Sequence, residues 1–187
     1  MRVLQLELPN LSATQNLGAL LADGLKAGDV ISLSGPLGPG KSALARSIIV
    51  SANPNETDVP SPTFSLVQTY ELEDKTPLWH LDLFRIENPE DAMQLGLDDA
   101  FVDAVCLIEW PERLKKLLPK TNLSIHLHWC QKEREFQENI DDCRNMSGVC
   151  NAYNCLPMGV DVYDNDNNLI GVSLGIRARC TAESPGG

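Results

Sequence analysis

A glycine-rich segment, GPLGPGKS at residues 35–42, constrains the fold of this chain more than any other stretch. It follows a short apolar run, Asp29–Ser34, that is typical of a buried strand, and a helix is predicted from Lys41 to about Val50. Glycines let successive backbone N–H groups turn toward one anion, and the start of a helix adds positive partial charge. Because a strand, a glycine loop and a helix follow one another, the segment fits the phosphate-binding pattern G-x-x-x-x-G-K-[ST]. The chain is therefore predicted to hold Mg²⁺ and ATP on a P-loop.

The residues of this segment have distinct predicted tasks. Lys41 would neutralise the β and γ phosphates, and the hydroxyl of Ser42 would ligate Mg²⁺. Pro39 has no N–H, so it withholds one donor from the phosphate. A glycine-rich turn without a ligand is the alternative, and the match at every defining position between the two flanking elements argues against it. The residues predicted to contact the nucleotide are Gly35, Gly38, Pro39, Gly40, Lys41, Ser42, Ala43 and Trp110.

Acidic side chains at the ends of two predicted strands are candidates for catalysis and metal binding. Asp82 follows the apolar residues 78–81, and Glu109 follows 105–108. A P-loop needs an acid to organise the metal or its water, and strand ends beside the loop supply such acids. Thr63, at the end of a proline-rich loop, could reach a γ-phosphate or the metal as mobile switch loops do. The plainer alternatives are a solvent-facing strand residue for Asp82, an acid leading a helix for Glu109 and a cap for Thr63.

Aromatic and histidine side chains near these acids carry weaker signals. Trp110 directly follows Glu109 and is either a core or rim aromatic or a residue that stacks beside the nucleotide. The histidines lie on predicted strands at spacings unlike those of clustered metal ligands, so we interpret them as ordinary strand positions. They are His80, His126 and His128.

Periodicity along residues 1–129 predicts one layered domain that mixes strands and helices. Strands are predicted at 3–8, 29–34, 64–72, 78–84, 104–108 and 122–128, and the third and fourth of these look like a hairpin. Helices are predicted after Ser12 as N-cap, from Lys41, near Pro89 and from Pro111 to Leu118. This order indicates an α/β fold of the P-loop NTPase type, with a central mixed, mostly parallel sheet flanked by helices.

The last third of the chain differs in character from the rest. Residues 130–187 are rich in Asn, Asp and Cys and have weak helical and strand periods, so they are predicted to form an irregular C-terminal tail beside an ATPase domain at 1–129. A weak hairpin is predicted within 160–174. Five of the six cysteines fall in this tail, and without a C-x-x-C pair they indicate neither a zinc site nor a redox motif.

The charge of the chain bears on its partners and its location. A formal net charge of -11 over 187 residues repels polyphosphates, so the chain is not expected to grip DNA or RNA alone. Any role on tRNA should therefore need a partner. The N-terminus carries no basic and apolar leader, and no run of eighteen apolar residues occurs, which predicts a cytoplasmic protein without a membrane span.

Four blocks of sequence, taken in order, resemble the TsaE (YjeE) family. They are GPLGPGKS at 35–42, VPSPTFSLVQTYE at 59–71, HLDLFR at 80–85 and LIEWPERL at 107–114. The glycine loop alone is shared by many families, whereas Ser-Pro-Thr-Phe, His-Leu-Asp-Leu and Glu-Trp-Pro in this order are far more specific. The resemblance covers about residues 1–129. The chain departs from the family at Pro39, where a small residue is usual, and after residue 129.

The resemblance implies an ATPase required to make threonylcarbamoyladenosine at adenosine 37 of tRNAs that read codons beginning with A. In the family a partner complex of the TsaD and TsaB type performs the transfer, ATP hydrolysis resets that complex, and tRNA is reached only indirectly. The implied activity is low without these partners. The resemblance assigns catalysis to Asp82, Thr63 and Lys41, and Mg²⁺ binding to Ser42 and Glu109. It places Trp110 beside the nucleotide.

Other nucleotide-dependent functions are weighed against this one. A small-molecule kinase also combines a P-loop with a strand-end acid, but it needs an arginine-rich lid, and only Arg85 and Arg113 lie between Arg46 and Arg134. A GTPase would need an N-K-x-D guanine reader, which the sequence lacks. A nucleotide-dependent assembly module without significant hydrolysis fits the same motifs. The ATPase rate with and without a partner would separate it from an enzyme.

Overall fold

The computed structural model describes residues 2–129 and 158–164. The strands are β1 (Arg2–Leu8), β2 (Val30–Ser34), β3 (Val67–Glu71), β4 (Pro77–Asp82), β5 (Val105–Glu109), β6 (Leu123–Trp129) and β7 (Met158–Asp164). The helices are α1 (Leu11–Ala22), α2 (Lys41–Ala52), α3 (Pro89–Met93) and α4 (Leu97–Asp103), with short 3₁₀ helices η1 (Pro111–Arg113) and η2 (Lys115–Leu117). Strands and helices are therefore mixed along the chain, as predicted for an α/β fold.

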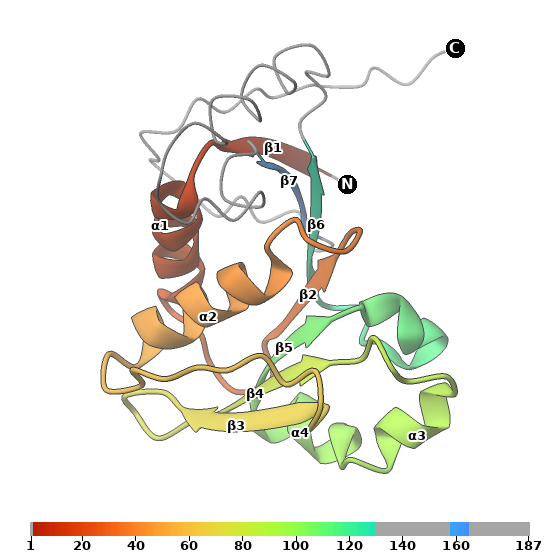
Figure 1. Ribbon diagram of the computed structural model, residues 1–187. Coiled ribbons are helices and arrows are strands. Elements are labelled where there is room, and N and C mark those ends of the chain that lie inside the picture. The colour runs from red at the N-terminus through yellow and green to blue at the C-terminus, as the bar shows by residue number, and fades with distance from the viewer. Residues whose placement is uncertain (1, 130–157, 165–187) are drawn as a thin grey trace, which may run out of the picture.

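All these strands form one sheet in the order β1-β7-β6-β2-β5-β4-β3. The central strands β6, β2, β5 and β4 are parallel, and the outer pairs β1–β7, β7–β6 and β4–β3 are antiparallel. Helices α1 and α2 pack on one face of the sheet, and α3 and α4 pack on the other (Figure 1). The predicted mixed sheet flanked by helices is confirmed, and its parallel part is the central part that adjoins the glycine loop.

Strands β2 and β5 are buried on both faces, which explains their largely apolar sequences. In β5, with the sequence VCLIE, every residue is buried. Because side chains alternate along a strand, Val105 and Leu107 join the cluster packed with α1 and α2. Cys106 and Ile108 join the cluster packed with α3 and α4. The sheet thus separates two hydrophobic cores.

Helix α1 begins at a cap different from the predicted one. Asn10 has an extended backbone, and its Oδ1 accepts a hydrogen bond from the Ala13 N–H at 2.9 Å. Ser12, the predicted cap, lies inside the helix. Asn and Ser are about equally good caps, so the residue types alone do not decide between the two positions. Helix α1 then packs closely on α2 at Gly18, where an added Cβ would collide with Ser47.

The helices of the described part are short and amphipathic. Helices α1 and α2 have 12 residues each, against about 20 for a helix that spans a bilayer. Within residues 2–129 and 158–164 no helix has both the length and the apolar character that a membrane crossing requires. Helix α2 instead buries Leu44 and Ile48 in the core and leaves Arg46 exposed. Its apolar face thereby anchors the helix that begins at the glycine loop.

The other predicted elements agree with the structure in type and differ mainly at their ends. Strands β3 and β4 form the predicted antiparallel hairpin, with Val67 opposite Leu81. Pro111 starts a helical segment, but this segment is 3₁₀ and breaks into η1 and η2 around Leu114. Helix α4 has no predicted counterpart. Its N-cap is Gly96, which offers no capping side chain as a sequence signal.

Strand β7 lies inside the segment predicted to be a separate tail. Met158–Asp164 pairs with β1 along one edge and with β6 along the other. Since both edges are occupied, this pairing corrects the predicted hairpin within 160–174, in which 160–163 would pair with 169–174. Between two strands, the backbone N–H and C=O groups on both edges of β7 are hydrogen-bonded. An isolated two-stranded hairpin, by contrast, is only marginally stable. Residues 130–157 and 165–187 lie outside the described part, and for them a separate tail stays a prediction.

Candidate functional site

The candidate site lies where three parallel strands end. Strands β2, β5 and β4 run side by side in one direction, so their carboxyl ends lie along the same edge of the sheet. Leu33 of β2 is opposite Glu109 of β5, and Glu109 is opposite Asp82 of β4. The glycine loop leaves β2 at this edge and leads into α2. The structure therefore brings the predicted loop and both predicted acids together, at the place where α/β sheets bind ligands.

The glycine loop has a backbone conformation that its glycines allow. Gly35, Gly38 and Gly40 have φ values of 124°, 96° and 88°, which residues with a Cβ rarely adopt. At Gly35 a Cβ would also collide with the carbonyl oxygen of Leu127 in β6. Gly40 is the N-cap of α2 and supplies no capping side chain, and Leu44 donates its N–H to the Gly40 carbonyl. The earlier N–H groups of this first turn have no intrahelical acceptor and suit an anion.

Pro39 and Ala43 lie on either side of the point where the loop becomes helix. Pro39 is buried and donates no N–H. The Ala43 carbonyl accepts a hydrogen bond from Ser47 Oγ at 2.7 Å. Because Ala43 lies in the first turn of α2, its backbone N–H has no intrahelical acceptor and is the group of Ala43 that could donate to a phosphate.

Lys41 is folded back onto the loop that carries it. Its side chain is buried, and Nζ donates hydrogen bonds to the carbonyl oxygens of Gly35 at 2.9 Å and Pro36 at 2.6 Å. Nζ also lies 4.0 Å from the centre of the Trp110 ring, a cation–π distance. The ammonium group is thus bonded to neutral carbonyl oxygens of its own loop, which give weaker hydrogen bonds than charged acceptors would.

The surroundings of Lys41 disfavour its charged form. Burial, the largest effect, lowers the pKa of the Lys41 ammonium group from its ordinary value, and the carboxylates of Glu109, Glu112 and Asp82 oppose this shift. A further anion beside the group would favour the charged form. A bound polyphosphate would therefore offset part of the penalty that this buried lysine carries.

A hydrogen-bonded chain of three side chains links β4, β5 and the start of α2. Ser42 Oγ donates to Glu109 Oε2 at 2.9 Å, and His80 Nε2 lies 2.9 Å from Glu109 Oε1. Glu109 is 2% exposed and His80 1% exposed, so bulk water does not reach the carboxylate. Because the Ser42 hydroxyl directs its hydrogen to Glu109, the lone pairs of its oxygen are available to another ligand.

Asp82 and Thr63 join the end of β4 to the loop that precedes β3. Thr63 Oγ1 donates to Asp82 Oδ2 at 2.9 Å, and Asp82 Oδ1 accepts the Phe84 N–H at 3.1 Å. Ser61 Oγ lies 2.8 Å from Thr63 Oγ1. Asp82 is buried. An ionised carboxylate has about four acceptor sites, so these bonds leave Asp82 able to accept from a water molecule.

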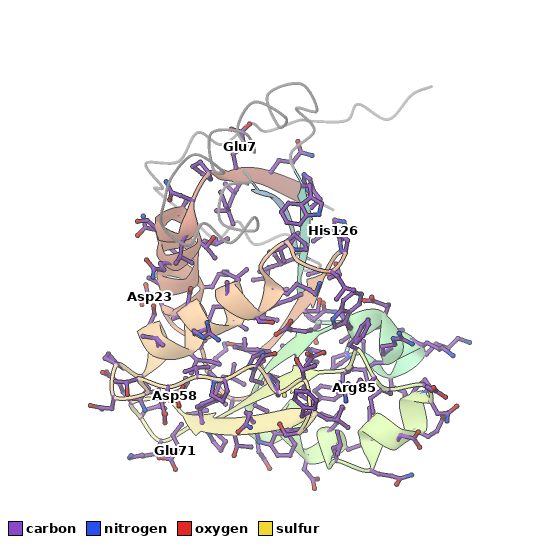
Figure 2. The ribbon with its side chains drawn as sticks, viewed as in Figure 1. Glu7, Asp23, Asp58, Glu71, Arg85 and His126 are labelled. Carbon is purple, nitrogen blue, oxygen red and sulfur yellow. The ribbon has the colours of Figure 1, made fainter. Side chains whose placement is uncertain are left out.

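Aromatic side chains border this edge of the sheet. Trp110 has a φ of 61°, and its N–H donates to the Leu33 carbonyl at 3.1 Å, which fixes it at the end of β5. Its ring packs against Phe84 with 4.9 Å between the centroids. Phe64 is 85% exposed, and the Arg85 guanidinium lies 4.6 Å from its ring centroid; Arg85 is labelled in Figure 2. Trp110 therefore contacts Phe84 and, at the start of α2, the Lys41 ammonium group.

The oxygen groups at this edge suit a metal that arrives with its nucleotide. In nucleotide sites Mg²⁺ takes few protein oxygens and completes its coordination with water and phosphate oxygens. Ser42 and Glu109 supply a hydroxyl and a carboxylate 2.9 Å apart. Among the residues with described positions, no cluster of three or more His, Cys, Asp and Glu side chains could hold a metal ion. A Mg²⁺ ion bound here would therefore need ligands from the phosphates.

His80 is the site residue that the sequence analysis missed. It occupies a regular position of β4, as predicted, but its Nε2 lies 2.9 Å from Glu109 Oε1. Alternation along β4 is the signal that could have found it, because His80 precedes Asp82 by two residues and so shares its face of the sheet. His126, by contrast, lies on β6, where its Nδ1 is 3.0 Å from Ser34 Oγ.

A solved structure resembles this chain in its fold. The crystal structure of Bacillus subtilis YdiB matches it with a TM-score of 0.59, covering 86% of this chain and 85% of that one. The sequence identity is 23%, so this likeness concerns the fold alone. It supports the observed α/β arrangement of a mixed sheet flanked by helices.

Several curated relatives share sequence with this chain, each called tRNA threonylcarbamoyladenosine biosynthesis protein TsaE. The Rickettsia felis protein is 39% identical over 120 residues, which are 64% of this chain and 70% of the relative. The Rickettsia bellii protein is 35% identical over 143 residues, or 75% of this chain and 90% of the relative. The Bacillus subtilis protein is 31% identical over 170 residues, or 90% of this chain and 100% of the relative.

The family model for threonylcarbamoyl adenosine biosynthesis protein TsaE matches residues 8–137. This range is more than half of the chain, and it contains the glycine loop, the hairpin and both strand-end acids. Because this model matches more than half of the chain and these relatives are 31–39% identical to it, the chain belongs to the TsaE family.

Proposed function

We propose that this chain binds and hydrolyses ATP with Mg²⁺ in support of threonylcarbamoyladenosine formation on tRNA. The observation that carries the proposal is the hydrogen bond from Ser42 to Glu109, beside the Lys41 loop and the Thr63–Asp82 pair. P-loop hydrolases use a loop that binds the phosphates, a hydroxyl that ligates the metal and a side chain that orients the attacking water. The pathway follows from the family, whose members carry the names of tRNA threonylcarbamoyladenosine biosynthesis proteins.

In this proposal the glycine loop and Lys41 bind the phosphates. The N–H groups of the first turn of α2 would donate to phosphate oxygens, with the helix start adding positive partial charge. Lys41 would exchange the carbonyl oxygens of Gly35 and Pro36 for charged phosphate oxygens. Such charge-assisted bonds are roughly twice as strong as neutral ones. Trp110 would stay against the Lys41 ammonium group and shield it from water.

Ser42 and Glu109 would hold Mg²⁺. When bound, the ion supplies positive charge that stabilises the negative charge of the transferring phosphoryl group. Glu109 keeps the Ser42 hydroxyl oriented through Oε2, and its burial keeps bulk water from competing for the carboxylate.

Asp82 would orient the water that attacks the γ-phosphate. Thr63 fixes one carboxylate oxygen and the Phe84 N–H fixes the other, so the plane of the carboxylate is set before any water binds. The remaining lone pairs can accept a hydrogen from that water. Because Thr63 belongs to the loop between α2 and β3, movement of this loop would also move the hydrogen-bond donor of Asp82. Asp82 should therefore affect hydrolysis more than binding.

The proposal includes a partner complex of the TsaD and TsaB type. A net charge of -11 disfavours direct contact with tRNA. Exposed carboxylates are spread over the surface, among them Glu7, Asp23, Asp58 and Glu71 (Figure 2). The tRNA, with its adenosine 37, would thus be bound by the partner complex that performs the transfer. ATP hydrolysis by this chain would reset that complex between turnovers.

The test of the site is a titration of the purified chain with ATP and with GTP, each with and without Mg²⁺. We expect ATP with Mg²⁺ to bind, to raise the melting temperature and to be hydrolysed slowly. Lys41→Ala should weaken binding markedly, because each hydrogen bond to a charged group contributes about 1.5–3 kcal/mol. Lys116→Ala is the matched control, since Lys116 is an exposed lysine in η2. Undiminished hydrolysis by Lys41→Ala would reject the assignment.

The test of the pathway is tRNA modification reconstituted with the partner complex. The wild-type chain should sustain repeated turnovers, and Lys41→Ala should allow only the first. Equal yields from the two proteins would refute the resetting role and leave the ATPase assignment standing.

A further inference from the structure

His80 has no role in the function proposed above, yet it lies inside the site. It stands in β4 opposite Leu107 of β5, and it is 1% exposed. Its Nε2 lies 2.9 Å from Oε1 of Glu109, whose side chain is also buried. A buried polar ring is unfavourable unless it is hydrogen-bonded. Its presence between the apolar residues of a core strand therefore calls for a physical reason.

The hydrogen bonding of the ring points to Glu109 as that reason. An ionised carboxylate only accepts hydrogen bonds, so Nε2 carries a hydrogen and donates it to Oε1. The other ring nitrogen, Nδ1, is buried and has no hydrogen-bond partner within the part of the chain that the structure describes. Most buried polar atoms in proteins do have a partner. Within the described residues, the ring is therefore oriented so that Nε2 bonds to Glu109 while Nδ1 is left without a partner.

Glu109 is thereby held from two sides. His80 donates to Oε1 and Ser42 donates to Oε2, both at 2.9 Å, so the carboxylate cannot turn without breaking one of these bonds. His80 comes from a strand whose register with β5 is fixed by a parallel ladder, in which Leu81 is beside Ile108. The ring is therefore anchored in the sheet, and the carboxylate is aligned between it and the start of α2.

We propose that His80 is a positioning residue for the Ser42–Glu109 pair. Its Nε2–H keeps Oε2 directed at the Ser42 hydroxyl, and this leaves the lone pairs of Ser42 Oγ for the Mg²⁺ that accompanies the nucleotide. The inference rests on the proposed ATPase function and deepens it. His80 acts on metal-dependent binding and turnover and has no part in phosphate binding by the glycine loop. Removing hydrogen-bond partners of metal ligands typically lowers metal affinity or activity by about 10- to 100-fold.

The experiment compares His80→Leu with His80→Gln. Leucine removes the donor and keeps a comparable volume, whereas glutamine can place an amide N–H near the position of Nε2. For each variant the ATP dissociation constant is measured with Mg²⁺ and with EDTA, together with kcat and the Mg²⁺ concentration at half-maximal hydrolysis. We expect His80→Leu to lose about 10- to 100-fold in kcat and to need more Mg²⁺. Its ATP binding in EDTA should be unchanged, and His80→Gln should recover most of the loss.

Further variants separate positioning from a loss of stability. Ile49→Val removes one buried methyl group from α2, far along the helix from Ser42. It should lower the melting temperature and leave the Mg²⁺ requirement unchanged. In a Glu109→Ala background, His80→Leu should cause no additional change in the Mg²⁺ requirement, because the group that it positions is already gone. If His80→Leu does not fold, His80→Ala takes its place.

A His80→Leu protein with the wild-type kcat and Mg²⁺ requirement would overturn the inference. A His80→Gln protein as impaired as His80→Leu would overturn it too. If the wild-type chain shows no Mg²⁺-dependent ATP binding at all, the proposed function falls and the inference falls with it. If wild-type binding depends on Mg²⁺ while the His80 variants keep that dependence, the inference alone is refuted.

Discussion

Gly35 meets two constraints at one position. Its φ is 124°, and a Cβ there would collide with the Leu127 carbonyl oxygen of β6. Gly24 also has a positive φ, 79°, but nothing lies within 4 Å of its Cβ position. Comparing substitutions at these two glycines therefore distinguishes the effect of backbone strain from that of a steric collision with the neighbouring strand.

Gly35→Ala is expected to lower the free energy of unfolding more than Gly24→Ala does. At Gly24 the left-handed backbone alone is penalised, by about 1–2 kcal/mol. At Gly35 the collision with Leu127 adds to the strain and displaces the loop, so ATP affinity should fall as well. Urea unfolding and ATP titration of both variants measure these effects. Equal effects in the two variants would mean that β6 does not restrict the loop.

Asp82→Asn is expected to keep ATP binding and to lose turnover. Asparagine retains an acceptor for the Thr63 hydroxyl but removes the negative charge. Loss of a group that assists proton transfer typically lowers the rate by about 10²–10⁴-fold. Single-turnover hydrolysis rates measure the loss of turnover, and ATP dissociation constants measure binding. Thr63→Ser, which keeps the hydroxyl that donates to Asp82, is the conservative control. A parallel loss of binding would assign Asp82 to the fold instead.

At the scale of residues, the sequence predicts those site residues that a short run of consecutive residues identifies. Consecutive residues specify the glycine loop, so its lysine and serine can be identified without knowing the fold. The contact of His80 with Glu109 joins residues 29 positions apart and depends on the register between β4 and β5. No local pattern reports that register, so the partner of His80 could not be predicted.

At the scale of elements, β5 is the strand that positions most of the site. It lies between β2 and β4, every one of its residues is buried, and it ends at Glu109 and Trp110. The Cys106 thiol donates to the carbonyl of Ala100, in the middle of α4, at 3.5 Å. This thiol is therefore a probe of whether β5 stays packed.

Cys106 is expected to resist thiol reagents while the protein is folded. Burial raises the pKa of its thiol from 9.0 to about 12, and only the thiolate reacts. Alkylation at about pH 8 should therefore be at least about 100-fold slower than in denaturant. The chain has six cysteines, so the alkylation of Cys106 has to be followed separately, by mass spectrometry of the peptide that contains it. Labelling at the unfolded rate would mean that β5 opens readily.

The same shift sets a pH dependence of stability. A thiol with a raised pKa in the folded state stays protonated longer there than in the unfolded chain. Its contribution to stability is complete below pH 9.0 and is lost as the pH rises toward about 12.

Elements could be predicted where one stretch of sequence holds their whole signal. The hairpin β3–β4 follows from two alternating runs around a polar turn, and the structure has it. The segment after Pro111 has a clear start but no sequence signal for its geometry. There Trp110 has a φ of 61° and Leu114 is buried between two 3₁₀ turns. Contacts with the core, not local preference, decide the form of this segment.

At the scale of the whole molecule, the sheet joins residues from distant parts of the chain. Strand β1 is linked to the other strands through β7, where Arg2 is opposite Asp164. The site lies on the other side of β6, at the ends of β2, β5 and β4. Stability and nucleotide binding should therefore depend differently on β7.

Deleting residues 130–187 is expected to lower the melting temperature and to leave ATP binding measurable at low temperature. The deletion removes β7 and leaves β1 without a strand partner. We expect a drop of about 10 °C or more, since 1 kcal/mol shifts the melting temperature of a domain of this size by about 2–4 °C. Deleting only 165–187 keeps the seven strands that the structure describes and should have a smaller effect. Equal melting temperatures for the two truncated proteins would contradict the structural role of β7.

The fold class could be predicted because the order of strands and helices along residues 1–129 restricts it to an α/β sheet. The place of β7 could not be predicted, because the strand period is weak in its surroundings and its partners lie far away in the chain.

The late position of β7 also affects how the molecule is completed during synthesis. Strand β1 leaves the ribosome early, whereas β7 is translated only at residues 158–164. At about 5–20 residues per second, the nascent chain spends about 2–7 seconds between the end of β6 at Trp129 and the end of β7 at Asp164, with no β7 to cover the open side of β6. Unpaired strand edges attract other chains. The newborn protein is therefore most exposed to aggregation in this interval, and chaperones that cover β-edges would protect it then.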